Sequence, residues 1–291
     1  MTPRLTWLFL CAVSLSSPLL AQGTDTTFSV PQGTRLRMDL DAGKIDVRTW
    51  HRAAVQIRGV HNPGTAIRAT LSAGLVSVSV TGRGVAECEC TLMVPADMAL
   101  TLGGGDTEIS VSGTQSEVVT RNYSGSITIK GGRGKISAES TLGEVAISEA
   151  RGRVTAKSLH STIRISDVEG DVEAESSSKH VYLTGITSHS VTASTVGGVL
   201  TFDGRFFDDG HYNFATHMGS IFLTVPEPVN ARVNVSTVSG AFSSALAHTR
   251  QDGARRGRFT VVFGSGTATV QAQTFAGGIV LRMPENAAAH H

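Results

Sequence analysis

The sequence contains few of the residues that most often carry chemistry. Among 291 residues there are only 3 Cys, and aromatic residues make up 5% of the chain. Charges nearly cancel, with 25 Lys plus Arg against 24 Asp plus Glu. A nucleic-acid-binding domain would show a basic excess or a basic stripe, so we expect no nucleic-acid partner.

Long hydrophobic runs are also missing beyond the first residues. The segment 1–21, "MTPRLTWLFLCAVSLSSPLLA", has one basic residue, a short apolar stretch and a small residue at its end. This layout is typical of a secretory signal sequence. We expect cleavage near Ala21 and export to the periplasm, the cell surface or the medium. No later stretch reaches the roughly 18 apolar residues of a membrane helix, so we expect no transmembrane segment after cleavage.

Removal of the signal would leave two cysteines, Cys88 and Cys90, in the tetrapeptide "ECEC". At positions i and i+2 of a strand they lie on the same face. A structural zinc site usually needs four ligands, and the sequence has no second cysteine pair. Two interpretations remain open: Cys88 and Cys90 are two small core residues, or they form a local disulfide. We expect no metal and no cofactor.

Patterns with a helical period are almost absent, whereas Gly, Ser, Thr and Val are abundant. An 18-residue unit, here called a rung, repeats instead. Numbered so that Gly125 and Gly143 occupy position 8, positions 10 and 12 are almost always large and apolar. The same register gives aliphatic residues at position 1, mostly Ala at position 3, and Ser or Thr at position 5. The position-1 residues are Val118, Ile136, Val154, Val172, Val191, Tyr212, Val233 and Val270.

Inward-facing residues at every second position, at 1, 3 and 5 and again at 10 and 12, indicate two short strands per rung. A turn at the glycine joins them. A single rung cannot bury its own apolar face, but stacked rungs form a continuous core. The sequence therefore predicts an all-β protein whose residues 98–284 form a parallel β-solenoid. The general bias of parallel crossovers makes it right-handed.

The outward position 4 supports this register. It reads Arg121, Glu139, Lys157 and Glu175, so opposite charges alternate from rung to rung. Each charge would then have a partner above or below it, which favours this alignment over slipped ones.

Some segments depart from the repeat. Residues 22–97 alternate as strands but fit the rung poorly, apart from one outlying rung between Leu36 and Val47, and we expect an antiparallel β cap there. Residues 204–211 insert a few residues between rungs, and 245–269 form a longer excursion that we expect to be a hairpin with its tip near 253–257. Residues 285–291 are expected to be a tail.

Two stretches resemble the bacterial putative-adhesin family. They are "GHYNFATHMGSIFLTVPEPVNARVNVSTVSGAF" at 210–242 and "GSGTATVQAQTFAGGIVLRMP" at 264–284. The resemblance extends over roughly residues 28–284 and rests on a recurring Ser/Thr-x-x-Gly unit. It implies an exported domain of repeated β-strands, and no catalytic residues come with it.

The sequence offers no convincing catalytic constellation. His160, Ser161 and Asp167 are the residue types of a hydrolase triad, but no nucleophile elbow accompanies them. His160, His180 and His217 fall near one corner of their rungs, where exposed turn residues are expected. We therefore predict no catalytic residues, no metal ligands and no enzymatic activity.

The strongest candidate for recognition is the outward column at position 11. Aromatic residues on a flat sheet face suggest recognition of a protein or a glycan. The candidate partner-binding residues are Arg164, Tyr182 and Phe222 in this column, with Phe206 and Phe207 in the nearby insertion. The sequence predicts a non-catalytic adhesin or envelope scaffold. Two alternatives remain, a polysaccharide-active β-helix enzyme and an envelope-stress accessory protein.

Overall fold

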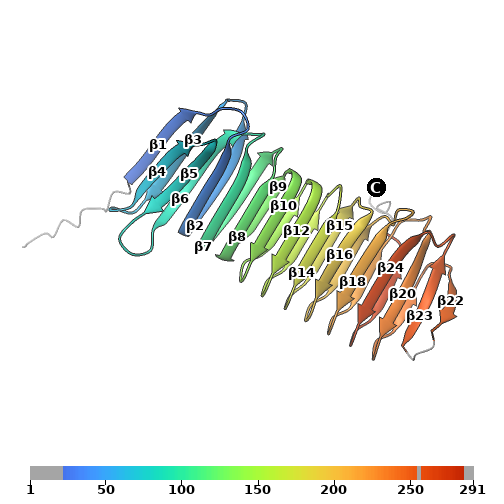
Figure 1. Ribbon diagram of the computed structural model, residues 1–291. Coiled ribbons are helices and arrows are strands. Elements are labelled where there is room, and N and C mark those ends of the chain that lie inside the picture. The colour runs from blue at the N-terminus through green and yellow to red at the C-terminus, as the bar shows by residue number, and fades with distance from the viewer. Residues whose placement is uncertain (1–21, 254–256, 285–291) are drawn as a thin grey trace, which may run out of the picture.

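The computed structural model describes residues 22–253 and 257–284, and all of its regular elements are β-strands (Figure 1). The expected signal sequence, the tail and part of the expected hairpin tip, residues 254–256, lie outside the described residues. The strands follow one another along an elongated stack, with the N-terminal strands at one end (Figure 1). Within the described ranges, no helix is long and apolar enough to cross a membrane.

The first strands of the rungs form one parallel stack. Ile136 is the partner of Val118 on one side and of Val154 on the other, so the predicted register is confirmed. In spatial order the strands are β7 (Ala99–Thr114), β8 (Val118–Ser124), β10 (Arg133–Ser140), β12 (Arg151–Ser158), β14 (Val172–Ser176), β16 (Ser190–Thr195), β18 (His211–Thr216), β24 (Ala268–Thr274) and β20 (Ala231–Thr237).

The second strands form another parallel stack, in which Val145 lies between Ile127 and Ile163. The long strand β7 contributes to both stacks. After β7 the order is β9 (Ile127–Gly131), β11 (Val145–Ser148), β13 (Ile163–Ser166), β15 (Val181–Ile186), β17 (Leu200–Gly204), β19 (Ile221–Thr224), β25 (Ile279–Arg282) and β21 (Phe242–Ser244).

The core consists of the side chains that alternate inward from the two stacks. Val154 and Ala156 of β12 and Ile163 and Ile165 of β13 are almost completely buried. Each rung removes about four such side chains from water, and burial of a large one stabilises the fold by roughly 1.5–3 kcal/mol. Because each rung buries its neighbour, the stack is stable only as a continuous array.

The Ser and Thr residues at position 5 hold the corner between the two strands of a rung. The Thr216 hydroxyl accepts a hydrogen bond from the Gly219 N–H at 3.1 Å and donates one to the Gly198 carbonyl oxygen at 3.2 Å. Other position-5 hydroxyls accept the equivalent N–H, at the pairs Ser140–Gly143, Ser158–Ser161, Ser176–Lys179, Thr195–Gly198 and Thr237–Gly240. The repeated Ser/Thr-x-x-Gly unit is therefore a corner tied both within its rung and to the rung before it.

The glycines at position 8 are required mainly by close stacking. A Cβ on Gly143 would lie 1.6 Å from the carbonyl oxygen of Gly125 in the previous rung. The sequence predicted that these glycines allow a sharp turn, and this reason applies to Gly125, whose φ of 86° favours glycine. Successive corners approach one another so closely that a side chain at most of these positions would push the rungs apart.

The stacking order departs from the sequence order at the C-terminal end. The rung formed by β24 and β25 lies between that of β18 and β19 and that of β20 and β21. Val270 of β24 is the partner of Tyr212 on one side and of Val233 on the other. The last rung in sequence is thus an inner rung of the stack, as the red β24 beside β18 shows in Figure 1.

The predicted hairpin at 245–269 is confirmed by the antiparallel pair β22 (Thr249–Asp252) and β23 (Arg258–Phe263). β23 also pairs antiparallel with β20, so that Phe259 faces Val235. The hairpin therefore covers the outer edge of β20, which would otherwise offer unpaired backbone groups.

The N-terminal strands differ in part from the expected antiparallel cap. They are β1 (Gln22–Ser29), β2 (Arg35–Trp50), β3 (Ala54–His61), β4 (Ala66–Ser72), β5 (Leu75–Thr81) and β6 (Glu87–Pro95). The pairs β1–β3, β3–β6 and β4–β5 are antiparallel, as expected. The expectation is wrong for β2, which is parallel to β5, β6 and β7.

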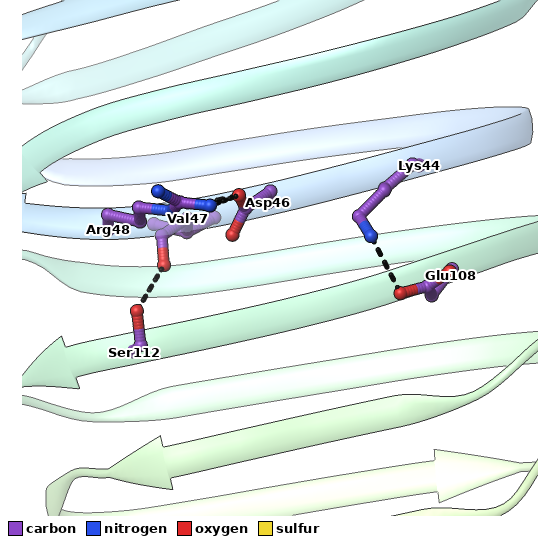
Figure 2. A network of polar contacts seen from close by, with 6 residues as sticks. All are labelled: Lys44, Asp46, Val47, Arg48, Glu108 and Ser112. Atoms are coloured by element: carbon purple, nitrogen blue, oxygen red, sulfur yellow. Dashed lines mark hydrogen bonds and ion pairs between the residues drawn. The ribbon is translucent and has the colours of Figure 1, made fainter.

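β2 continues the stack of rungs because its inward residues repeat those of β7. Leu36 faces Leu100 and Ile45 faces Ile109, which confirms the outlying rung seen in the sequence. Figure 2 shows how the outward side chains join the same two strands. Lys44 Nζ lies 2.9 Å from Glu108 Oε1, and the Ser112 hydroxyl donates to the Val47 carbonyl oxygen at 3.5 Å.

The question left open at Cys88 and Cys90 is answered by a disulfide between them. Both residues are buried in β6, where Cys88 and Cys90 are ladder partners of His61 and Gly59 in the adjacent strand β3. Gly59 of β3 pairs with Cys90, and a Cβ at this position would lie 3.3 Å from the Cys88 sulfur and 2.0 Å from Ile67 Cδ1. The glycine thus provides the space that the disulfide and Ile67 occupy.

Candidate functional site

The outward column at position 11 forms a continuous strip, here called the Tyr182 face. Its members are ladder partners in consecutive strands, so neighbouring residues lie about 4.8 Å apart along the stack. They are Arg164, Tyr182, Thr201, Phe222 and Val280. The parallel strands therefore bring together the three candidate residues that the sequence placed in this column.

Tyr182 is half-buried and lies between two polar side chains. The Arg164 guanidinium carbon lies 5.3 Å from the centre of the Tyr182 ring, and the His180 ring lies 5.8 Å from it. Arg164 also pairs with Glu144 at 2.7 Å, which holds the guanidinium against the ring. Cation–π contacts at exposed positions stabilise by roughly 0.5–1 kcal/mol. The phenol ring is thus fixed in orientation while part of its surface stays accessible.

Phe222 has an equivalent environment two strands further on. The Arg282 guanidinium carbon lies 5.8 Å from the centre of its ring. Arg282 Nε donates a hydrogen bond to the Thr224 hydroxyl at 3.1 Å, which positions the side chain. Sequence reasoning missed Val280 as a member of this face and Arg282 as a neighbour of Phe222, because both belong to the inserted rung. Their place follows only from the pairing of β19 with β25.

The prediction for Phe206 is wrong. Its side chain is 4% exposed and belongs to the core, where its ring lies 5.6 Å from Phe202 and 4.7 Å from Tyr212. In this part of the stack the inward residue at position 3 is Phe214 instead of Ala, and its ring packs with Phe202, which also contacts Phe206. A buried aromatic ring of this kind cannot contact a partner.

Phe207, the next residue, is half-buried and is not part of the Tyr182 face. It lies in the connection between β17 and β18, where its ring is 4.7 Å from His189 and 5.6 Å from the Arg205 guanidinium carbon. The five candidate residues therefore divide into a three-residue face, one core residue and one separate loop residue.

The residue types of a hydrolase triad are not assembled as a triad. His160 Nδ1 lies 3.2 Å from the Ser178 hydroxyl, and the Ser161 hydroxyl donates to the Leu142 carbonyl oxygen. Asp167 lies beyond β13, in a turn with φ of 52°. His160 and Ser161 therefore make structural contacts with the corners of the next and the previous rung.

The three histidines near the corner are also separated by their contacts. His180 Nδ1 accepts a hydrogen bond from the Val199 N–H at 2.9 Å, and the His217 ring stacks on Phe275 at 4.9 Å. Among residues 22–253 and 257–284, no three His, Cys, Asp or Glu side chains are grouped so that they could hold a metal ion.

Together these features define an all-β protein of stacked rungs with one partly exposed aromatic face. Neither a family model nor a curated protein matches the chain. Weak structural likeness is found to crystal structures that are named as putative adhesins. One from Bacteroides fragilis has a TM-score of 0.44 at 11% identity, covering 91% of this chain and 98% of the other.

Two further structures give similar values. A putative adhesin from Parabacteroides distasonis has a TM-score of 0.41 at 10% identity, covering 90% of this chain and 97% of the other. One from Parabacteroides merdae has a TM-score of 0.40 at 8% identity, covering 90% and 96%.

Proposed function

We propose that this chain is an exported, non-catalytic adhesin or envelope scaffold that binds a glycan or a protein through the Tyr182 face. The observation that carries the proposal is the continuous strip from Arg164 to Val280 on consecutive strands. Tyrosine, phenylalanine and arginine are among the residues most enriched in binding sites. Here the rigid sheet holds them in fixed positions, so that little side-chain entropy remains to be lost on binding.

The proposal includes a right-handed β-solenoid as the form of the stack and an N-terminal β region that caps one end. The support for right-handedness is the general bias of parallel crossover connections. The support for a cap is the set of antiparallel pairs among β1, β3, β4, β5 and β6.

Export is proposed from the signal-like segment 1–21. The buried disulfide between Cys88 and Cys90 supports it, since disulfides persist in oxidising compartments. Cell fractionation with detection of the N-terminal residue checks this point. Recovery of the chain in the cytoplasm with residues 1–21 intact would contradict it.

A non-catalytic role is proposed because the charged groups of the middle rungs are engaged with one another. Arg121 pairs with Glu139 at 3.0 Å, and Lys157 pairs with Glu173 at 3.2 Å and Glu175 at 3.4 Å. Most glycoside hydrolases need a pair of carboxyl groups facing the glycosidic bond. Turnover of any polysaccharide by the purified chain would contradict this part of the proposal.

The binding face is tested with a glycan array and with extracts of envelope proteins, both probed with the purified chain. Binding should fall at least tenfold when Tyr182→Ala and Phe222→Ala are combined. The matched control combines Thr192→Ala with Asn213→Ala, because these exposed residues are ladder partners on the first stack of strands. Unchanged binding by the aromatic double variant would overturn the assignment of the face.

A further inference from the structure

A second surface lies along the corner between the two strands of each rung. It is here called the apolar corner and consists of Tyr123, Leu142, Leu159, Val196, Met218, Phe275 and Val238, given in stacking order. These are seven of the eleven large hydrophobic residues that are exposed in the described part of the chain. Scattered exposed apolar residues are ordinary, but their concentration along one edge indicates an interaction surface.

The corner is a regular part of the stack, because backbone hydrogen bonds join successive corners. The Leu142 N–H donates to the Tyr123 carbonyl oxygen, and the Met218 N–H donates to the Val196 carbonyl oxygen, both at 2.9 Å. The most prominent side chains are those of Val238, Met218 and Tyr123, which are 72%, 65% and 61% exposed. The side chains thus follow one edge of the stack, with Ser177 in place of an apolar residue in the rung of β14.

The opposite edge of the stack carries charged residues instead of apolar ones. It carries ion pairs between neighbouring rungs, including Lys130–Glu149 at 3.1 Å and Arg151–Glu169 at 3.2 Å. An edge of stacked rungs can therefore be covered with charged groups in this protein. The apolar corner lacks such a cover over the rungs from β8 to β20.

The two halves of the apolar corner have different surroundings. Beside the first half, the position-4 charges Arg121, Glu139, Lys157 and Glu175 line a shallow groove together with Leu159. Beside the second half, position 4 is uncharged, with Ser194, Ala215, Gln273 and Ser236 in stacking order. One half is thus grooved and charged, whereas the other is neutral and projects strongly exposed side chains.

We propose that the apolar corner binds a second copy of this chain in an antiparallel arrangement. A two-fold axis at the level between Ser177 and Val196 makes the corner self-complementary. It places Tyr123 opposite Val238, Leu142 opposite Phe275 and Leu159 opposite Met218. Each copy then sets its projecting half against the grooved half of the other.

Charge favours this arrangement over a parallel one. The antiparallel axis places the four charged position-4 residues of one copy opposite the four uncharged ones of the other. A two-fold axis along the stack would instead bring Glu139 to the level of the other copy's Glu144 and Lys157 to that of its Arg164, against one opposite-charge pair, Glu175 and Lys179. Like charges at an interface are unfavourable, and they select against wrong registers.

The expected association is reversible. An aromatic side chain can bury roughly 150–250 Å² and an aliphatic one less, so two aromatic and five aliphatic half-exposed side chains offer on the order of 500 Å² per copy. A standard protein interface buries about 800 Å² per partner. The dimer should therefore form and dissociate over an accessible range of protein concentration.

Sedimentation equilibrium of the full chain over a hundredfold concentration range is the first test. We expect a monomer–dimer equilibrium that is weakened at least tenfold by Leu159→Asp and by Met218→Asp. Val85→Asp is the matched control, because Val85 is 73% exposed but lies outside the corner. A chain that stays monomeric throughout, or a dimer that both corner variants leave unchanged, would overturn the proposal.

The antiparallel arrangement is tested by disulfide trapping in a chain that carries Cys11→Ser. Leu142 and Phe275 lie five rungs apart within one copy, roughly 24 Å, so cysteines at these positions can join only between copies. Leu142→Cys combined with Phe275→Cys should give a covalent dimer, whereas neither single variant should. A covalent dimer from either single variant, or none from the double variant, would contradict the arrangement.

This proposal is independent of the Tyr182 face. The Tyr182→Ala and Phe222→Ala double variant should keep its dimerisation constant, and the corner variants should keep the intrinsic affinity of the face for its partner. Loss of dimerisation in the Tyr182 face variant would show that the surface between copies lies there and not at the corner.

Discussion

Arg282 Nε donates a hydrogen bond to the Thr224 hydroxyl at 3.1 Å, although the two residues are 58 positions apart in the sequence. The contact exists because β25 lies directly beside β19, where the rung of β24 and β25 is inserted. The same insertion places Arg282 over the Phe222 ring and adds Val280 to the Tyr182 face. The candidate binding surface therefore depends on the last rung of the chain.

Thr216→Val should destabilise the protein by about 1–3 kcal/mol. Valine keeps the shape of threonine but leaves the Gly219 N–H and the Gly198 carbonyl oxygen without the hydroxyl that bonds to both. Thr216→Ser is the control and should retain most of the stability. Urea unfolding of the three proteins measures the difference, and equal midpoints for valine and threonine would contradict the role of the corner.

Gly143→Ala should destabilise the protein by about 2–4 kcal/mol, within the range of severe overpacking. The new methyl group would lie 1.6 Å from the Gly125 carbonyl oxygen, and backbone at this corner cannot move without separating two rungs. Gly23→Ala is the control, because a Cβ there meets nothing within 4 Å. Thermal unfolding compares the two variants, and a Gly143 variant as stable as the control would contradict the close stacking.

Tyr212 should make stability fall at alkaline pH. Burial raises the pKa of its phenol, and the hydrogen bond from the Phe207 N–H lowers it by less. Because the folded pKa lies above the unfolded value of about 10, this contribution is complete below pH 10 and is lost as pH rises through the folded pKa.

Tyr212→Phe should remove that alkaline loss of stability, while costing about 1–3 kcal/mol at neutral pH. The cost arises because the phenol donates to the Ser188 carbonyl oxygen at 2.7 Å and accepts from the Phe207 N–H at 2.8 Å. Unfolding midpoints of both proteins at pH 8 and pH 11 measure the effect. An alkaline decrease that is equally steep in the variant would assign it to other groups.

Replacement of Cys88 and Cys90 by alanine should destabilise the protein by only about 1–2 kcal/mol. The disulfide closes a loop between residues two apart, and the entropy removed from the unfolded chain is small for so short a loop. Because both sulfurs are buried, thiol labelling after reduction should require prior unfolding. Rapid labelling of the native, unreduced chain that carries Cys11→Ser would contradict the disulfide.

The sequence predicted the rung register residue by residue, because inward alternation and the Ser/Thr-x-x-Gly corner repeat with one period. It could not place the last rung, since Val270 and Ala272 would fit equally well beside β18 or beyond β20. Phe206 was misplaced because a single aromatic residue in an insertion has no periodic partner that reveals its burial. The sequence did not reveal that β2 pairs with three other strands, because this one long strand spans both halves of a rung.

The apolar corner was overlooked at the sequence level for a different reason. Five of its seven residues share position 6, but three rungs carry Thr141, Ser177 or His217 there, so the apolar column is interrupted. Leu142 and Met218 occupy position 7, whereas Leu159 and Val196 occupy position 6. Only the exposed turn geometry brings them to a common edge.

The order of the strands is the central claim, because both proposed surfaces depend on it, and disulfide trapping tests it directly. Ala215 and Gln273 are ladder partners in adjacent strands, as are Gln273 and Ser236. Cysteines at 215 and 273 should therefore form an intramolecular disulfide, and so should cysteines at 273 and 236. Cysteines at 215 and 236, about 9.6 Å apart with β24 between them, should not. A disulfide between 215 and 236, with none to 273, would contradict the inserted rung.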